Sequence, residues 1–234
     1  MFKIKIADFI VQINNKYDFL EAFCKDYITD EENVDFTVFC TDDDIEKERE
    51  ISEGDFSNGY IESICIYRKI CLLLPEYDSF VMHGAVIEVD NKSYAFLARS
   101  GTGKSTHIKL WHSLLGERVR VINGDKPILR YINNELWVYG TPWCGKEGWN
   151  TNAKSKLKAL CFLERAQENS IKELSSGDSA TRIMKQILMP KDAIGAIKTL
   201  ELVDKMIADT KTWLLGCNIS KEAAKIAYEA MSKE

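Results

Sequence analysis

One segment of the chain has the composition of a phosphate-binding loop, Ala98-Arg99-Ser100-Gly101-Thr102-Gly103-Lys104-Ser105-Thr106. Its glycines let successive backbone N–H groups turn toward an anion, and the helix expected after it points its positive end at the same place. The spacing Gly-x-Gly-Lys-Ser between a strand and a helix is that of a Walker A loop, although Ala98 replaces its first glycine. Alanine is accommodated there if its φ is negative. We therefore predict ATP and Mg²⁺ as ligands of Ser100, Gly101, Thr102, Gly103, Lys104, Ser105 and Thr106.

Within this loop, Lys104 is expected to reach the β- and γ-phosphates and Ser105 to bind Mg²⁺. Phosphoryl transfer also needs a carboxylate near the metal, commonly at the end of a neighbouring strand. Asp125 follows such a strand and is expected to be a Mg²⁺ ligand, a base toward an acceptor hydroxyl, or both; a plain turn aspartate is the alternative. His83 precedes the hairpin that leads into the loop. It is expected to bind phosphate or tune a carboxylate, with packing or capping as the alternative. The catalytic candidates are thus Asp125, His83 and Lys104, and the metal candidates are Ser105 and Asp125.

A second glycine-rich segment, residues 141–148, carries Trp143 and Lys146. Lys146 is a candidate for neutralising phosphate or substrate charge, and Trp143 for lining a pocket. Arg130 and Arg165 stand near strand positions that could face the same site. Each arginine is equally a candidate for a structural ion pair, which is the commoner role.

These residues must be positioned by an α/β fold. Apolar patterning predicts a strand over 2–13, a helix over 17–27, a strand over 34–40 and a helix over 59–75. A hairpin follows, with strands at 85–88 and 94–97, and its second strand enters the glycine loop. We divide the chain into an N-terminal α/β unit, 1–76, and a core with C-terminal helices, 77–234. The remaining predicted elements are helices 104–115, 177–188, 192–208 and 219–232, and strands 118–123, 127–132, 136–139, 157–164 and 210–217.

Composition restricts the functional class. The 234 residues carry a net charge of −5, so no basic field favours nucleic acid or an anionic membrane. No apolar run reaches the roughly 18 residues that span a bilayer, and a cytoplasmic protein is expected. The seven cysteines are expected to be reduced and buried, with Cys144 in its glycine-rich loop the one candidate for an exposed thiol. The acidic run 41–44 is interpreted as a solvated helix start rather than a metal site.

The order His-Gly, hairpin, Ser-Gly-Thr-Gly-Lys-Ser, helix, strand and Gly-Asp resembles the catalytic core of HPr kinase/phosphorylase. More broadly it is similar to the phosphoenolpyruvate carboxykinase-like P-loop superfamily, with small stand-alone members closest. The resemblance covers about residues 80–190 and is best over 81–148. It implies a mixed β-sheet P-loop core, ATP-dependent phosphorylation of a serine hydroxyl, and the roles above for Lys104, Ser105, His83 and Asp125. Relatives of this kind carry paired aspartates after the acidic strand, whereas Asp125 stands between Gly124 and Lys126.

Three functions follow as hypotheses. The first is a Mg²⁺- and ATP-dependent kinase acting on a hydroxyl of a peptide, protein or small molecule, with a homo-oligomer suggested by analogy. The second is a nucleotide-binding sensor or docking module of reduced catalytic activity. The third, a nucleoside-monophosphate kinase or GTPase, is disfavoured because about 97 residues precede the loop and no Asn-Lys-x-Asp motif occurs.

Overall fold

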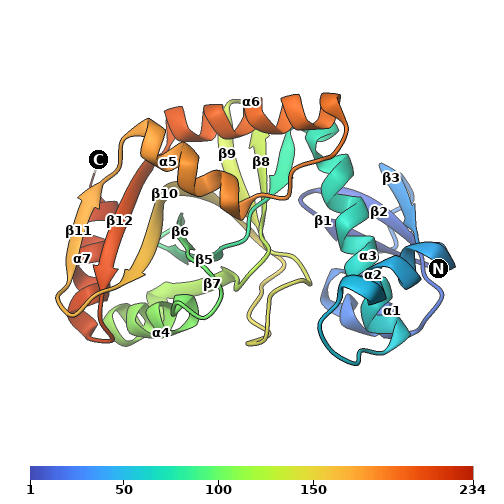
Figure 1. Ribbon diagram of the computed structural model, residues 1–234, viewed down its shortest axis with the longest axis horizontal. Coiled ribbons are helices and arrows are strands. Elements are labelled where there is room, and N and C mark those ends of the chain that lie inside the picture. Colours follow the sequence, from blue (N-terminus) through green and yellow to red (C-terminus); the bar gives the residue numbers. More distant parts are fainter. Residues whose placement is uncertain (234) are drawn as a thin grey trace.

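The chain forms two β-sheets surrounded by helices in a computed structural model, which describes residues 1–233. The smaller sheet has the order β1-β2-β3; β1 and β2 are antiparallel, and β2 and β3 are parallel. Figure 1 places this sheet with α1, α2 and α3 at one side of the molecule. The N-terminal elements are β1 (Phe2–Ile6), β2 (Phe9–Asn14), α1 (Phe19–Phe23), β3 (Phe36–Phe39), α2 (Asp42–Ile51), α3 (Asn58–Leu73) and the 3₁₀ turns Lys25–Tyr27 and Leu74–Tyr77.

The single strand predicted over 2–13 is wrong, because the chain reverses at Ala7 and Asp8 to make a hairpin. Both residues have positive φ, 50° and 62°, as the two central residues of a type I′ turn require. Ala-Asp is not one of the residue pairs that signal this turn. The apolar pattern on either side of it therefore predicted one continuous strand. The helix predicted over 17–27 is likewise split into α1 and a 3₁₀ turn.

The larger sheet has nine strands and mixed directions, which confirms the α/β class. Its main path is β4-β8-β9-β10-β6-β5-β7, and β12 joins β10 and β11. The long strand β10 is parallel to β6 and β12 and antiparallel to β9. The strands are β4 (Ser79–Val81), β5 (Ala85–Val89), β6 (Lys92–Leu97), β7 (Val119–Asn123), β8 (Ile128–Ile132), β9 (Glu135–Tyr139), β10 (Lys154–Arg165), β11 (Ser170–Glu173) and β12 (Lys211–Cys217).

Helices cover both faces of this sheet, and the strand residues alternate between them with period two. On β6, Ala95 and Leu97 pack toward α5 and α6, whereas Tyr94 and Phe96 pack toward α4 and α7. Figure 1 shows α6 and α4 on opposite sides of the strands. Burial on both faces explains why these strands are almost continuously apolar. The helices are α4 (Lys104–Leu115), α5 (Ser176–Ile183), α6 (Ala193–Asp209) and α7 (Lys221–Met231), with 3₁₀ turns at Gly116–Arg118 and Met184–Gln186.

Sequence patterning predicted most elements of this larger sheet. Helix 104–115 is confirmed with its bounds, while β11 was missed because Ser170–Glu173 contains one apolar residue. The N-terminal sheet does not have a wholly separate core. Val81, Ile128 and Tyr139 of the larger sheet are buried in the same apolar cluster as α3 and β2. Helix α3 is therefore fixed against the strands that carry the candidate site.

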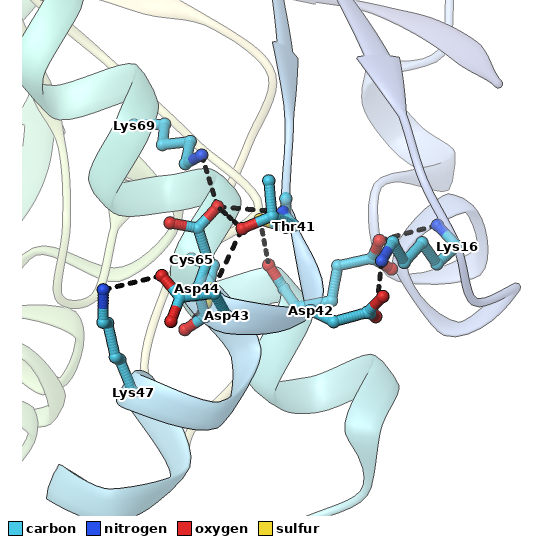
Figure 2. A network of polar contacts seen from close by, with 10 residues as sticks. Lys16, Thr41, Asp42, Asp43, Asp44, Lys47, Cys65 and Lys69 are labelled. Atoms are coloured by element: carbon cyan, nitrogen blue, oxygen red, sulfur yellow. Dashed lines mark hydrogen bonds and ion pairs between the residues drawn. The ribbon is translucent and has the colours of Figure 1, made fainter.

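The acidic run is a helix start, as expected. Thr41 caps α2, accepting from the Asp44 backbone N–H at 3.1 Å while Asp44 accepts from the Thr41 N–H at 2.8 Å, a complete capping box. Figure 2 shows that lysines surround the run, pairing Asp42 with Lys16 at 2.5 Å, Asp43 with Lys47 at 2.6 Å and Asp44 with Lys69 at 2.6 Å.

Among residues 1–233, no group of three or more His, Cys, Asp or Glu side chains is arranged to hold a metal ion by itself. No helix in this range is both long and apolar enough to cross a bilayer.

Candidate functional site

The glycine loop joins the buried end of β6 to the first turn of α4. Gly101 and Gly103 have φ of 76° and 127°, a region that other residues rarely adopt, so both glycines are needed for this path. Ala98 is buried and keeps a negative φ, which resolves its departure from the glycine pattern. Helix α4 begins at Lys104 without a side-chain cap. Its first backbone N–H groups therefore keep their capacity to bind an anion.

Lys104 folds back over this loop. Its Nζ donates to the Ala98 carbonyl oxygen at 3.1 Å and lies 3.3 Å from His83 Nε2. Burial lowers the pKa of Lys104, and the nearby Asp125 carboxylate opposes that shift. Ser105 and Thr106 occupy the first turn of α4 beside it. The ammonium group thus lies between the glycine loop and the connection from β4 to β5, which carries His83.

His83 lies in the connection between β4 and β5. Its backbone N–H donates to the Gln186 carbonyl at 2.6 Å, and the N–H of Gly84 donates to the Asp125 carbonyl at 2.9 Å. These two bonds fix the connection between the 3₁₀ turn that follows α5 and the turn after β7. The imidazole consequently meets Asp125, with Nε2 3.0 Å from Oδ1.

Asp125 is the centre of the cluster. Its Oδ1 faces His83 and its Oδ2 lies 3.0 Å from Lys126 Nζ. Burial would raise the pKa of Asp125, but the hydrogen bond from His83 and the charge of Lys126 outweigh it and hold the pKa at about 2. Nε2 carries at most one hydrogen, so it either donates to Asp125 or accepts from Lys104. A phosphate that attracts Lys104 would therefore leave Nε2 free to donate to Asp125.

A buried asparagine that sequence reasoning missed positions Asp125. The Oδ1 of Asn123 accepts from the backbone N–H of Asp125 at 2.8 Å and of Lys126 at 2.7 Å. Its Nδ2 donates to the Thr141 carbonyl at 3.0 Å. Asn123 has no exposed surface, and each polar atom of its amide is used. The signal for this role was present in the sequence, because Asn two residues before Asp favours an Asx turn.

Two cavities meet at the cluster. The first, of about 740 Å³, is lined by His83, Asp125 and residues of α3 and of the loop after β9. The second, of about 840 Å³, is lined by residues 98–102, the end of β10 and α5. Lys185 and Gln186 line both. Lys104 contacts a lining residue of each cavity, Ala98 and His83, so it lies where they join.

Of the further candidates, Trp143 and Lys146 both line the first cavity. Trp143 is half-buried, its Nε1 donating to the Ser63 carbonyl of α3 at 3.1 Å. Arg165 reaches the glycine loop instead, donating to the carbonyls of Gly101 and Thr102 at 2.6 and 3.3 Å. Arg165 thus supports the loop from outside.

Arg130 is not brought to this cluster, despite the expectation of a phosphate or substrate contact. Its Nη1 donates to the Ala7 carbonyl at 2.6 Å, and its guanidinium lies 3.9 Å from the centre of the Phe9 ring. Arg130 therefore ties the N-terminal hairpin to β8 through a backbone hydrogen bond and ring packing, rather than through the ion pair given above as the alternative. A planar guanidinium on an aromatic face is a favourable packing arrangement.

Cys144 differs from the expectation of an exposed thiol. The residue is 8% exposed, and its Sγ accepts from Asn150 Nδ2 at 3.1 Å. Burial raises the pKa of the Cys144 thiol, which lowers the fraction of reactive thiolate. Residues 145–148 of the glycine-rich loop are exposed, whereas Cys144 is buried.

We expect Cys144 to react slowly with a thiol reagent in the native protein, because its thiol is buried and protonated at about pH 8. Ellman's reagent measures the rate. All seven cysteines should react at once in concentrated guanidinium. Cys144→Ser should leave the native progress curve unchanged; loss of a fast native phase in that variant would contradict the expectation.

Comparison with known proteins gives a weak likeness of fold. No family model matches the chain, and no curated protein does. Among solved structures, the Hpr(Ser) kinase/phosphatase from Coxiella burnetii aligns with a TM-score of 0.30 and 13% identity. The alignment covers 55% of this chain and 98% of that one.

Proposed function

We propose that this protein is an ATP- and Mg²⁺-dependent kinase that transfers the γ-phosphoryl group to a hydroxyl, with serine of a peptide or protein the leading acceptor and a small molecule the other. The supporting observation is the convergence of Lys104, His83 and Asp125 at the junction of two cavities. The Lys104 ammonium lies 3.3 Å from His83 Nε2, and the same nitrogen lies 3.0 Å from the Asp125 carboxylate.

The glycine-loop cavity is the proposed nucleotide site. The uncapped start of α4, the two glycines of positive φ and the half-buried Lys104 ammonium together suit a chain of phosphates. In this assignment Ser100, Gly101, Thr102 and Gly103 supply the loop, and Lys104, Ser105 and Thr106 supply the helix start. Arg165 donates to the loop carbonyls of Gly101 and Thr102, and the backbone N–H groups of the loop are then left to face the anion.

The donor set suits magnesium. Mg²⁺ prefers hard oxygen ligands and is commonly held by one or two protein groups together with substrate phosphates. The hydroxyl of Ser105 and the carboxylate of Asp125 are the protein oxygens proposed for it. When bound, the ion would neutralise phosphate charge and help to align the phosphates.

The chain's own groups then account for the transfer. The acceptor hydroxyl oxygen forms a bond to the γ-phosphorus, the bond from that phosphorus to the β,γ-bridging oxygen breaks, and ADP leaves. The hydroxyl proton passes to the Asp125 carboxylate and from there to solvent. His83 holds this carboxylate by donating to Oδ1, and Lys104 stabilises the charge that develops on the phosphates.

The organisation into units is also a proposal. Separate sheets support a boundary near residue 76. The shared apolar cluster around α3 indicates that the two units, 1–76 and 77–234, are packed firmly together. In this arrangement the N-terminal unit supplies one wall of the acceptor cavity.

ATP labelled in its γ-phosphate tests the function directly. With Mg²⁺ and a panel of serine peptides, proteins and small alcohols, label should appear in an acceptor. Lys104→Ala should lower this transfer by about a hundredfold or more, because the developing phosphate charge loses its partner. Lys109→Ala, on the exposed surface of the same helix, is the matched control and should transfer at the native rate.

Tight ATP binding without transfer to any acceptor would contradict the kinase and favour the nucleotide sensor. The Asn123 and Thr141 contacts would then position Asp125 for binding alone.

A further inference from the structure

The cavity on the Asp125 side has a lining that suggests what kind of acceptor it takes, provided that the proposed function holds. It has two chemically different parts. An aromatic wall comes from both units, with Phe23 and Tyr67 packed against Trp143 at ring-centroid distances of 6.0 and 5.4 Å. Ile64, Ile187 and Leu188 continue this apolar surface.

The second part is positive. Four basic side chains line the cavity, Arg68, Lys126, Lys146 and Lys185, against the single carboxylate of Asp125. Two of them are already neutralised. Arg68 forms a two-point ion pair with the buried Glu48, at 2.8 and 3.0 Å, and Lys126 pairs with Asp125.

Lys146 and Lys185 differ from these two. Among the described residues neither has an ion-pair partner, and both are exposed at the edge of the cavity. They come from separate elements, Lys146 from the loop after β9 and Lys185 from the 3₁₀ turn after α5. Unpaired lysines beside an aromatic wall provide charge complementarity for a ligand that is both apolar and anionic.

We propose that the acceptor is an amphipathic anion, a serine segment of a peptide whose hydroxyl is flanked by an aromatic or aliphatic group and an acidic group. The apolar side chain would lie on the wall formed by Phe23, Tyr67 and Trp143. The acidic group would be held by Lys146 and Lys185, leaving the hydroxyl to face Asp125. A cavity of about 740 Å³ accommodates such a segment.

A pair of fluorescent probes tests the pocket without any phosphoryl transfer. Anilinonaphthalene sulfonate is an aromatic anion, and N-phenylnaphthylamine is the same scaffold without the sulfonate. We expect the wild type to bind the anion about tenfold more tightly than the neutral probe, because two unpaired cations favour its charge. Lys146→Met combined with Lys185→Met should bring the two affinities to within about threefold.

The matched control is Lys198→Met combined with Lys205→Met, since these lysines line a different cavity beside α6. This control should keep the wild-type preference. Equal binding of both probes by the wild type would overturn the proposal, and so would an equal loss of preference in the control.

Competition then identifies the acceptor. A serine peptide with acidic and aromatic neighbours should displace the anionic probe, and its counterpart with lysine in place of the acid should do so at least about tenfold less well. Equal displacement by the two peptides, or displacement by phenyllactate alone, would overturn the peptide assignment. Because no readout requires ATP, failure of this proposal is distinguishable from failure of kinase activity.

Discussion

Asp125→Asn is expected to reduce phosphoryl transfer by about a thousandfold while ATP still binds, since a positioned proton acceptor contributes roughly that much. Asparagine keeps the size of the side chain but cannot accept the hydroxyl proton, and it is a poorer Mg²⁺ ligand. Transfer of labelled γ-phosphate gives the rate, and titration calorimetry with ATP gives the affinity. The amide also loses the ion pair with Lys126, so the variant's fold should be checked by circular dichroism.

Asp8→Asn is the matched control for this variant. Asp8 resembles Asp125 in having an ion pair, to Lys154 at 2.7 Å, and a second partner, the Tyr139 hydroxyl at 2.6 Å. It lines neither cavity at the cluster. Asp8→Asn should therefore alter stability but not transfer. A similar loss of transfer in both variants, or near-native transfer by Asp125→Asn, would contradict the assigned role.

The pH dependence of Asp125 provides an independent check of the same side chain. Its folded pKa of about 2 lies below the ordinary value for aspartate, so folding favours the ionised form. Ionised Asp125 thus contributes stability that is present above the unfolded pKa and is lost as pH falls through the folded one. The difference in unfolding free energy between wild type and Asp125→Asn should accordingly shrink as pH falls from about 5 toward about 2.

The local segments that form the candidate site were predictable from sequence because each has a strong short-range signal. Gly101 and Gly103 mark a loop of positive φ, and the apolar periodicity after them marks α4. The convergence of Lys104, His83 and Asp125 was expected from their places beside neighbouring strands and from the resemblance. It depends on strand pairing between segments far apart in the chain, such as β5 with β7.

The surroundings of other side chains could not be predicted from the sequence, because they are set by contacts with residues far away in the chain. Arg130 looks like a candidate phosphate ligand in the sequence, yet the Phe9 ring and the Ala7 carbonyl that engage it belong to a hairpin over a hundred residues earlier. Cys144 stands in a glycine-rich loop, but its side chain is buried and its Sγ accepts from Asn150 Nδ2. Lys185 has no motif at all, and only the fold brings it to both cavities. Sequence therefore identifies the chemistry of a loop better than the neighbours of an isolated side chain.

Gly140→Ala is expected to destabilise the protein by about 3 kcal/mol or more, at the upper end of overpacking effects. A Cβ at this position would overlap the Thr151 carbonyl oxygen and lie 2.7 Å from that of Ile122. Both obstacles are backbone atoms, so no side chain can rotate away. The two residues that carry these oxygens are also hydrogen-bonded to each other, since the Thr151 N–H donates to the Ile122 carbonyl at 3.0 Å.

The methyl group would therefore push the segment before β10 away from β7. The same segment bridges Asn150 to Asn123, the residue that holds the turn at Asp125. Loss of stability should thus be accompanied by a loss of ATP-dependent transfer at temperatures where the variant is still folded. Urea unfolding measures the first effect and the labelled-ATP assay the second.

Gly177→Ala is the matched control for this substitution. It adds the same methyl group inside α5, where no heavy atom lies within 4 Å of the new Cβ. There the smaller entropy of the unfolded chain should stabilise the protein by up to about 1 kcal/mol. An unfolding midpoint of Gly140→Ala equal to that of wild type would mean that the contact between β7 and residues 149–153 is absent. The placement of Asp125 by Asn123 would then lose its physical basis as well.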